Sequence, residues 1–235
     1  MVTAVNKRAS EITWSCPTIV RHGFSLVELL VVISVIGLLM AILLPALSRA
    51  REQATVVAVN AELRQIGLAL DMYMDDHNGK NPPTRKDCAM GWQDHQLPPE
   101  LVEGNYLPGP GDDAATMSAG MEDRFNRANT YRYWAVGELY QNDRFMPFIK
   151  ASLYVPDGFP HNEGLPETDI QYSDPAVSPV TWAIFSQGPR FDEWQMIKQL
   201  HCPVPKRTWY DPGKRTGVIV RMRLKNGAQV GSFEK

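Results

Sequence analysis

A long apolar run over residues 24–47 constrains this chain more than any other feature of its sequence. The only charged residue in the run is Glu28. About 20 apolar residues in a helix cover the roughly 30 Å hydrocarbon core of a bilayer, so the run is long enough to span a membrane. A carboxylate inside such a segment costs on the order of 2.5–3.5 kcal/mol on insertion scales. We therefore expect a membrane-spanning helix in which Glu28 has a function.

The pattern becomes amphipathic after Pro45. Apolar residues recur there at spacings of three and four, as on one face of an α-helix: Val56, Val59, Leu63, Ile66, Leu70 and Tyr73. Charged residues are expected on the other faces: Arg51, Glu62, Arg64, Asp71 and Asp75. A helix from Phe24 to His77 would be about 80 Å long, too long for a compact domain to bury throughout. We predict one helix over 24–79, with residues 24–47 in lipid and residues 48–79 packed on a head over 80–235.

Two residues within the apolar run weaken a regular helix. Proline removes a backbone hydrogen bond and usually kinks the helix, and glycine costs roughly 1 kcal/mol relative to alanine. Pro45 and Gly37 are therefore the expected kink positions. Asn78-Gly79 is expected to end the helix, because Gly79 can adopt the left-handed C-cap conformation and Pro82-Pro83 prevents continuation.

The segment Gly23-Phe24-Ser25-Leu26-Val27-Glu28 resembles the processing site of type IV pilins and of type II secretion pseudopilins. The resemblance implies that residues 1–23 are a leader, that a prepilin peptidase cuts after Gly23, and that Phe24 is then methylated. It also implies that Glu28 pairs with the N-terminal amine of a neighbouring subunit; the alternative is that Glu28 lies near the interfacial end of the helix and pairs with its own N-terminus. An ordinary signal anchor has no reason to place one glutamate five residues after the glycine. In filaments of this family the segment matching residues 37–45 can lose helicity; the alternative is a plain kinked membrane helix.

The charges that flank the run only weakly favour a cytoplasmic N-terminus. Lys7, Arg8 and Arg21 precede the run, whereas Arg49 and Arg51 follow it. The resemblance decides the orientation, since the peptidase of that family cuts on the cytoplasmic side. It implies a single-pass protein of the bacterial inner membrane with a periplasmic head.

Charge argues against nucleic acid as a partner. The 235 residues carry a formal net charge of −2. The leader carries +2, so the mature chain carries about −4. A mildly acidic chain lacks the basic patch that binds phosphates. The length suffices for one membrane stem and one head of moderate size.

The head is predicted to contain an antiparallel sheet resting on the amphipathic half of the helix, an α+β fold with long loops. Residues 180–186 read as a strand. Residues 217–225 alternate apolar and basic side chains and are expected to form a half-buried strand. Asn226-Gly227 then predicts a hairpin with a return strand over 228–233.

Other parts of the head carry weaker patterns. We expect a short helix within 97–107, a strand over 130–136 and a helical turn over 137–142. The rest of 80–120 is expected to form loops, and the proline-rich stretch 155–179 a long irregular connection.

Two cysteines remain in the mature chain, because Cys16 lies in the leader. In an oxidising compartment Cys88 and Cys202 either pair as a disulfide or stay as separate thiols.

The C-terminal part also resembles pseudopilin-like proteins that carry Ser-x-Gly-Pro-Asp followed by Tyr-Asp-Pro. Here the residues are Ser186-Gln187-Gly188-Pro189-Arg190 and then Tyr210-Asp211-Pro212. The major pseudopilin of this family often binds calcium in a C-terminal loop. Arg190 stands where the related pattern has an acidic residue, so we expect no metal and no cofactor. If calcium bound here, its candidate ligands would be Asp192, Glu193 and Asp211.

The sequence gives no indication of an enzyme. Nucleophile-elbow, dinucleotide-binding and P-loop motifs are absent, and four histidines are scattered without a metal-ligand spacing: His77, His95, His161 and His201. The adjacent His201 and Cys202 are read as part of a structural turn.

The expected function is that of a non-enzymatic pseudopilin, a structural subunit of a type II secretion pseudopilus that moves protein across the outer membrane. The resemblance implies as partners other pseudopilin subunits, the prepilin peptidase, an inner-membrane assembly platform and the lipid bilayer. Two alternatives stay open: a type IV minor pilin, and a membrane-anchored surface module that binds glycans or protein. The aromatic residues that favour such a module are Trp92, Trp134, Trp182, Trp194 and Trp209.

Overall fold

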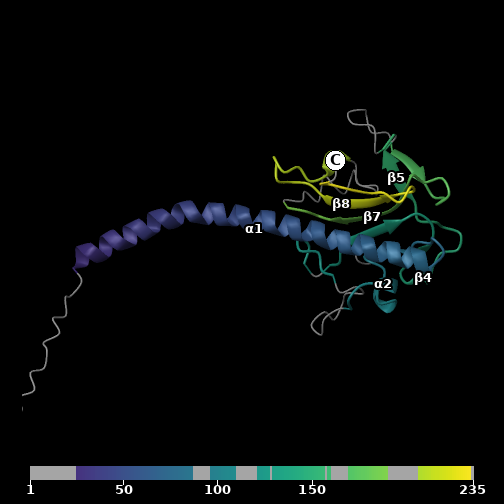
Figure 1. Ribbon diagram of the computed structural model, residues 1–235, viewed down its shortest axis with the longest axis horizontal. Helices are drawn as coiled ribbons and strands as arrows, with labels where there is room; N and C mark the ends of the chain where they lie inside the picture. Colours follow the sequence, from purple (N-terminus) through teal and green to yellow (C-terminus); the bar gives the residue numbers. More distant parts are fainter. Residues whose placement is uncertain are drawn as a thin grey trace, which may run out of the picture. The chain divides into compact units, whose positions relative to one another are not determined.

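The computed structural model describes residues 25–86, 96–109, 121–127, 129–156, 158–159, 169–189 and 206–233. The chain divides into two compact units, Met1–Ser48 and Arg49–Lys235. Helix α1 (Leu26–Asp76) begins in the first unit and ends in the second, with Pro45 inside it. The fold is α+β, as predicted, with a long apolar helix followed by mainly antiparallel sheets (Figure 1).

The end of α1 is closed as the sequence predicts. Asn78 and Gly79 both adopt positive φ values, of 56° and 76°. The Gly79 N–H donates to the Met74 carbonyl at 2.7 Å, which satisfies one of the last carbonyl groups of the helix. The chain then leaves through Pro82 and Pro83 towards the sheets.

The centre of the second unit is a four-stranded antiparallel sheet. Its order is β2 (Arg132–Ala135), β7 (Val180–Ser186), β8 (Ile219–Leu224) and β9 (Gln229–Gly231). In register, Trp134 lies opposite Ala183, and Phe185 opposite Val220. All four strands fall within segments that the sequence predicts as strands.

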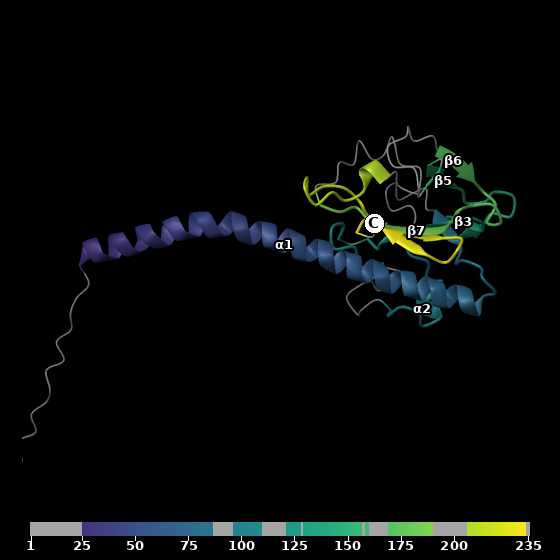
Figure 2. The same cartoon turned by 45° about the horizontal axis from the view of Figure 1, so that its top comes forward.

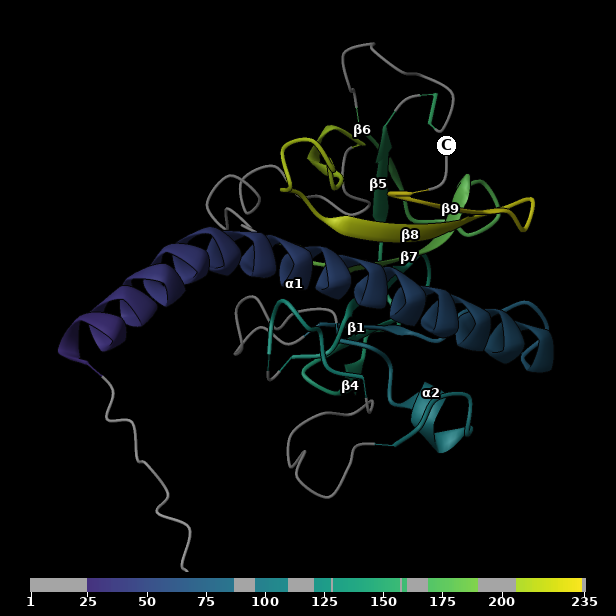
Figure 3. The same ribbon diagram turned by 60° about the vertical axis from the view of Figure 1, so that its left-hand side comes forward.

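Each face of this sheet covers a hydrophobic cluster. On one face the apolar stripe of α1 (Val56, Val59, Leu63, Ile66 and Leu70) packs against Tyr131, Tyr133, Trp182, Ile184 and Ile219. On the other face Ala183, Phe185, Val220 and Met222 pack with Leu153, Val155 and Trp209. Figures 2 and 3 show β5 (Leu153–Pro156) and β6 (Asp169–Tyr172) on the side of β7 and β8 away from α1. The sheet is thus the middle of three layers.

A smaller three-stranded sheet lies beside the first, in the order β1 (Thr84–Lys86), β3 (Leu139–Gln141) and β4 (Arg144–Phe145). The Thr84 hydroxyl donates to the Ala135 carbonyl and accepts from the Ala135 N–H, both at 2.9 Å, which joins β1 to β2. Helix α2 (Glu100–Glu103) falls within the predicted 97–107 window, and a 3₁₀ helix spans Lys206–Thr208.

Three predictions of local structure were wrong. Residues 84–86, expected in a loop, form β1, which pairs in parallel with β3. The predicted helical turn over 137–142 is β3 itself. The stretch 155–179, expected to be irregular, contains β6, which pairs with β5. Strands of two to four residues carry too little periodicity to be recognised, because their pairing is set by tertiary contacts rather than by propensity.

Strand β8 also differs from its prediction of a half-buried strand. Val220 and Met222 have no exposed surface on one side, but Ile219 and Arg221 are also buried on the other, at 0% and 3% exposure. The basic side of β8 faces α1 rather than water. The charges that the alternating pattern seemed to place in solvent therefore have partners on the helix and on β9.

Candidate functional site

The start of α1 is stabilised by a reciprocal pair of hydrogen bonds. The Ser25 N–H donates to Glu28 Oε2 at 3.1 Å, and the Glu28 N–H donates to Ser25 Oγ at 3.3 Å. This is a capping box, in which two free donors of the first helical turn are satisfied by side chains. The Ser-x-x-Glu pattern that identifies such a box is present at Ser25 and Glu28, but no prediction above includes it.

The first part of α1 exposes its apolar side chains on every side. Every Leu, Val, Ile and Met from Leu26 to Leu47 is exposed, with fractions between 46% and 79%. The helix is long and apolar enough to cross a membrane. A helix that is apolar all round is stable only among lipid tails or other apolar helices, so this segment needs one of those environments.

Gly37 and Pro45 both lie within α1, which continues through them as one helix. A Cβ atom added at Gly37 would meet nothing within 4 Å. The Ser34 hydroxyl donates to the Leu30 carbonyl at 2.7 Å, one turn back, and so satisfies its polar group within the helix. The predicted kink at these two residues stays a prediction.

Several residues predicted to be functional lie outside the described part of the chain: Gly23, Phe24, Cys88, Cys202, Asp192 and Glu193. Cleavage, methylation, a disulfide and most of the calcium ligand set therefore stay predictions. Asp211 is described, and its Oδ1 accepts backbone N–H groups of Gly213 at 2.7 Å and Lys214 at 3.3 Å. Within the described residues no group of three or more metal-ligating side chains comes together.

In the second unit, α1 is fastened to the sheet by polar contacts at the edges of its apolar stripe. Asp71 Oδ1 forms an ion pair with Arg223 Nε at 2.8 Å, and Asp71 Oδ2 accepts a hydrogen bond from Gln229 Nε2 at 2.8 Å. Gln229 Oε1 in turn accepts from Arg221 Nη1 at 3.2 Å. Asp71, expected on a face of the helix other than the apolar stripe, thus contacts two strands of the sheet.

Glu62, also expected on a face other than the apolar stripe, makes a second contact of this kind. One carboxylate oxygen accepts from Arg124 Nε at 2.7 Å and also pairs with its Nη2, while the other accepts from the Tyr131 hydroxyl. Burial and this hydrogen bond raise the pKa of Tyr131. Glu62 therefore joins α1 to the loop before β2 and to Tyr131, which directly precedes that strand.

Between these two contacts the helix approaches the sheet closely at Gly67. A Cβ atom there would lie 2.9 Å from Gln229 Oε1, 3.1 Å from Trp182 Cη2 and 3.3 Å from Arg221 Cδ. Only glycine lets the helix lie at this depth without displacing those side chains. The depth and rotation of α1 on the sheet are thus set by one small residue and two carboxylates.

The buried carboxylate of Asp123 joins the loop before β2 to the end of β7. Asp123 is 1% exposed and accepts from Ser186 Oγ at 2.6 Å. Backbone N–H groups of Phe125 and Gln187 also donate to it, at 3.0 and 3.3 Å. Burial raises the pKa of Asp123, although these hydrogen bonds and Arg132 act in the opposite direction. Ser186, singled out in the sequence as the first residue of the pseudopilin-like Ser-x-Gly-Pro pattern, has here a structural contact.

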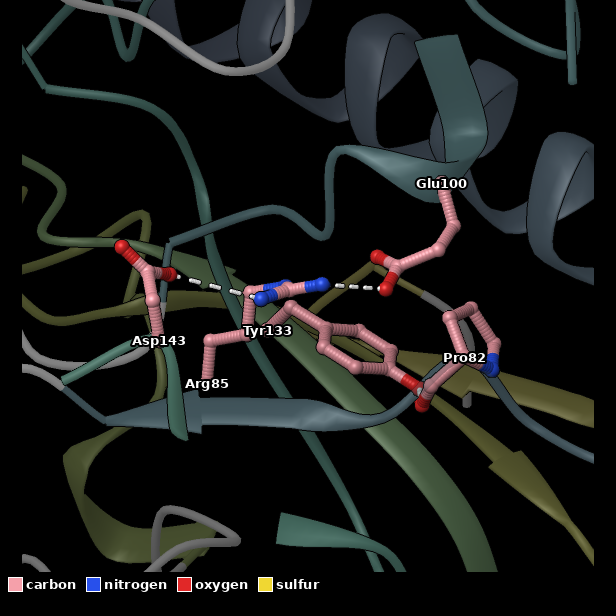
Figure 4. A network of polar contacts seen from close by, with 5 residues as sticks. All are labelled: Pro82, Arg85, Glu100, Tyr133 and Asp143. Carbon is pink, nitrogen blue, oxygen red and sulfur yellow. Dashed lines mark hydrogen bonds and ion pairs between the residues drawn. The ribbon is translucent and has the colours of Figure 1, made fainter. Parts of the chain in front are cut away.

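The small sheet is tied to α2 and to its own hairpin through Arg85. Figure 4 shows the guanidinium between two carboxylates: Nη2 pairs with Glu100, and Nη1 lies 3.4 Å from Asp143 Oδ1. In the same view the Tyr133 hydroxyl donates to the Pro82 carbonyl at 2.7 Å. These contacts hold the residues after α1 against β2 and α2.

The aromatic side chains within the described residues serve mainly as core. Trp182 is fully buried and Trp209 is 9% exposed, whereas Trp92 and Trp194 lie outside the described part. Near the end of α1, Tyr73 and His77 stack with ring centroids 3.8 Å apart. The Tyr106 hydroxyl donates to Asp76 at 2.7 Å, and this bond raises the pKa of Tyr106 to about 12. Of the tryptophans proposed for a glycan surface, Trp182 and Trp209 therefore belong to the core.

Comparison with known proteins finds a family match within the first unit. Residues 20–44 match the prokaryotic N-terminal methylation motif. By this segment, the chain is similar to type IV pilins and to a type II secretion pseudopilin. The match includes the Gly23-Phe24 junction, Glu28 and Gly37, and ends one residue before Pro45.

Curated relatives agree with this assignment. The chain is 36% identical over 57 residues to the type II secretion system core protein G of Pseudomonas aeruginosa, covering 24% of this chain and 40% of that one. It is 43% identical over 56 residues to the type IV wide pilus major component of Thermus thermophilus, covering 24% and 43%. It is 34% identical over 77 residues to the type IV major fimbrial protein of Dichelobacter nodosus, covering 33% and 46%.

The matches span less than half the length of each of these relatives. No solved structure matches the chain. The family and the apolar helix support a pilin-like structural subunit that is anchored in a membrane.

Proposed function

We propose that the chain is a pseudopilin, a subunit of a type II secretion pseudopilus, cut after Gly23 and methylated at Phe24. The subunit waits in the inner membrane with its head in the periplasm and is then drawn into a filament that pushes substrate towards an outer-membrane pore. The observation that supports this best is the first part of α1: an all-round apolar helix, exposed throughout, most of which lies within the matched methylation motif. Such a helix suits lipid before assembly and neighbouring helices after it.

The relatives also favour a second candidate, a type IV pilin. Two of the three are named as components of type IV pili or fimbriae. Both candidates use the same N-terminal segment and differ in the machine that extends the filament. Purification of native filaments together with a type II secretin, or with a pilus assembly apparatus, distinguishes them.

Processing is tested at the junction itself. The Gly23→Val variant places a branched side chain where a peptidase of this family is expected to accept only glycine, so an immunoblot should show the full-length precursor in the membrane. Ser25→Ala, two residues away, is the matched control and should be cut normally. Normal maturation of Gly23→Val would contradict the proposal.

Glu28 has two readings that one pair of variants separates. In the proposed filament its carboxylate pairs with the Phe24 amine of a neighbour, and two opposite charges in a low-dielectric core offset part of each other's desolvation. In the described structure it caps its own helix through Ser25. Glu28→Leu removes both interactions, whereas Ser25→Ala removes only the Ser25 half of the capping box.

The proposal expects Glu28→Leu to be inserted and cleaved but to form no filaments, as counted by electron microscopy. Ser25→Ala is expected to assemble normally. If both variants lost filaments equally, helix capping would explain the effect. If Glu28→Leu assembled like the wild type, the proposed pairing would have to be abandoned.

A further inference from the structure

The turn at residues 211–216 is closed by its own hydrogen bonds. Asp211 and Thr216 form an isolated β-bridge, and the Arg215 N–H donates to the Asp211 carbonyl at 2.7 Å. Asp211 Oδ1 accepts from two further backbone N–H groups inside the turn. Arg215 has a φ of 53°, so the backbone reverses at this residue. The turn therefore presents Lys214 and Arg215 in a fixed arrangement.

An ion pair places this turn on α1 at the beginning of the second unit. Arg215 Nη1 lies 3.8 Å from Glu52 Oε1, and the two side chains are 25% and 24% exposed. In Figures 1 and 2 the turn lies over the part of α1 that enters the second unit. Lys214 is 79% exposed, and its Nζ lies 3.9 Å from Asp211 Oδ2, so its ammonium group remains largely in solvent.

Two more basic residues lie on the same stretch of α1. Arg49 and Arg51 are exposed, and their side chains form no ion pair with another described residue. Arg49 is two residues from Leu47, the last residue of the apolar run. At 1.5 Å of rise per residue, Arg49 and Arg51 are within roughly 6 Å of the end of that run along the helix. We call Arg49, Arg51, Lys214 and Arg215 the proximal collar.

The collar is basic within an acidic chain. Among the described residues its four cations have two carboxylates as ion-pair partners, Glu52 and Asp211, which leaves a net charge of +2 for this group, whereas the mature chain carries about −4. Both carboxylates are engaged within the collar, Glu52 by Arg215 and Asp211 by its own turn. The far end of α1 has the opposite character, with Asp75 and Asp76 exposed and no basic residue in its last turn. The positive charge is thus concentrated where the chain leaves the apolar run.

We propose that the proximal collar binds anionic phospholipid headgroups of the membrane that holds the apolar run. Long basic side chains next to a membrane span extend towards the headgroups while their apolar stems stay on the helix. Each such residue near an anionic surface gains about 1 kcal/mol, a gain that salt screens. The Arg215–Glu52 ion pair holds the turn against α1. The cations of the turn are thereby added to the basic surface that Arg49 and Arg51 form on the helix. The inference depends on membrane anchoring and not on filament assembly.

The test uses the full chain in vesicles of phosphatidylcholine alone or mixed with phosphatidylglycerol. An amine-reactive label is applied, and mass spectrometry follows the modification of Lys214 and, as a control, of Lys80 beyond the far end of α1. Labelling of Lys214 should be up to about fivefold slower in the anionic vesicles, as 1 kcal/mol per basic group implies. Lys80 should react equally in both, and high salt should remove the difference.

Variants locate the effect within the collar. Arg49→Gln combined with Arg51→Gln removes two exposed cations that support no contact in the head, and it should abolish most of the protection of Lys214. The matched control, Lys80→Gln, removes one exposed cation elsewhere and should change nothing. Equal labelling of Lys214 in both kinds of vesicle would overturn the proposal. The proposal would also be overturned if Lys214 were protected in both kinds of vesicle and the protection increased with the protein-to-lipid ratio. That result would identify a second copy of the chain as the partner.

Discussion

The two parts of α1 show how one helix can be stabilised by two different surroundings. Between Leu26 and Leu47 the large apolar side chains point in every direction and none is buried, whereas Val59, Leu63, Ile66 and Leu70 have no exposed surface at all. The helix is continuous across this change. The difference therefore lies in the arrangement of apolar residues, all round in one part and as a stripe in the other. A stripe can be buried by the chain's own sheet, but an all-round surface needs lipid or other helices.

The polar residues of the two parts differ in the same way. Glu28 in the first part is satisfied by Ser25, three residues away. Glu62 and Asp71 in the second part bind Tyr131, 69 residues away, and Gln229, 158 residues away. Because the hydrogen bond of Glu28 is made within its own helix, the first part of α1 can contact different partners. Long-range satisfaction fixes the second part to one partner, the head.

The largest expected difference between the two parts comes from deleting one leucine side chain in each. Leu63→Ala should lower the free energy of unfolding of the head by about 2–5 kcal/mol, because it removes a fully buried side chain and leaves a cavity. Leu39, which is 54% exposed in the first part, is the matched control, and Leu39→Ala should change that energy by less than about 0.5 kcal/mol. Urea unfolding of the full chain in detergent, followed by tryptophan fluorescence, measures both. If both variants lowered the free energy of unfolding equally, the first part of α1 would contribute to the stability of the head, against this expectation.

The polar contacts give a smaller difference. Asp71→Ala leaves Arg223 and Gln229 partly buried without their acceptor, so we expect a loss of about 1–2 kcal/mol. Asp75→Ala removes an exposed carboxylate one turn later and should fall within about 0.5 kcal/mol of the wild type. The same urea experiment compares them. If Asp75→Ala cost as much as Asp71→Ala, loss of negative charge rather than loss of the contact would be responsible.

The two glycines of α1 should respond to alanine with opposite signs. At Gly67 a Cβ atom would crowd Gln229, Trp182 and Arg221, so Gly67→Ala should destabilise the head by about 1 kcal/mol or more. At Gly37 the space is open, so Gly37→Ala should strengthen the helix by up to about 1 kcal/mol. Circular dichroism of the full chain in detergent, at increasing temperature, reports both. Destabilisation by both variants would indicate that Gly37 has a packing contact that an isolated chain does not reveal.

The sequence predicted the elements that carry a long or repeated pattern. The helix, its apolar stripe, its C-cap at Gly79 and the strand over 180–186 all follow from periodicity or from a single well-defined residue preference. The processing motif was likewise visible, because it depends on a few adjacent residues.

What the sequence did not predict depends on contacts between distant residues. Nothing local to Glu62 or Asp71 indicates that Tyr131 or Gln229 will reach them. The burial of Arg221 has the same cause, since an alternating strand with basic residues is also typical of a solvent-facing surface. The short strands β1, β3 and β4 exist through pairing with one another, which no window of their own sequence specifies. The capping box at Ser25 is different, because its pattern was present and was not used.

The smallest predicted effect concerns Asp123, a buried carboxylate of the head that α1 does not contact through any described hydrogen bond. Burial raises the pKa of Asp123 above 3.8, so the folded protein binds this proton more tightly than the unfolded chain does. Ionised Asp123 therefore costs stability at neutral pH, and this cost disappears as the pH falls through the folded pKa towards 3.8. The wild type alone cannot isolate this effect, because the chain carries many other carboxylates. The comparison with Asp123→Asn can, because both chains share every other carboxylate. As the pH is lowered from about 7 to about 4, the wild type should gain free energy of unfolding relative to Asp123→Asn. A difference that is constant over this range, measured by urea unfolding at each pH, would show that the hydrogen bonds from Ser186, Phe125 and Gln187 compensate the burial fully.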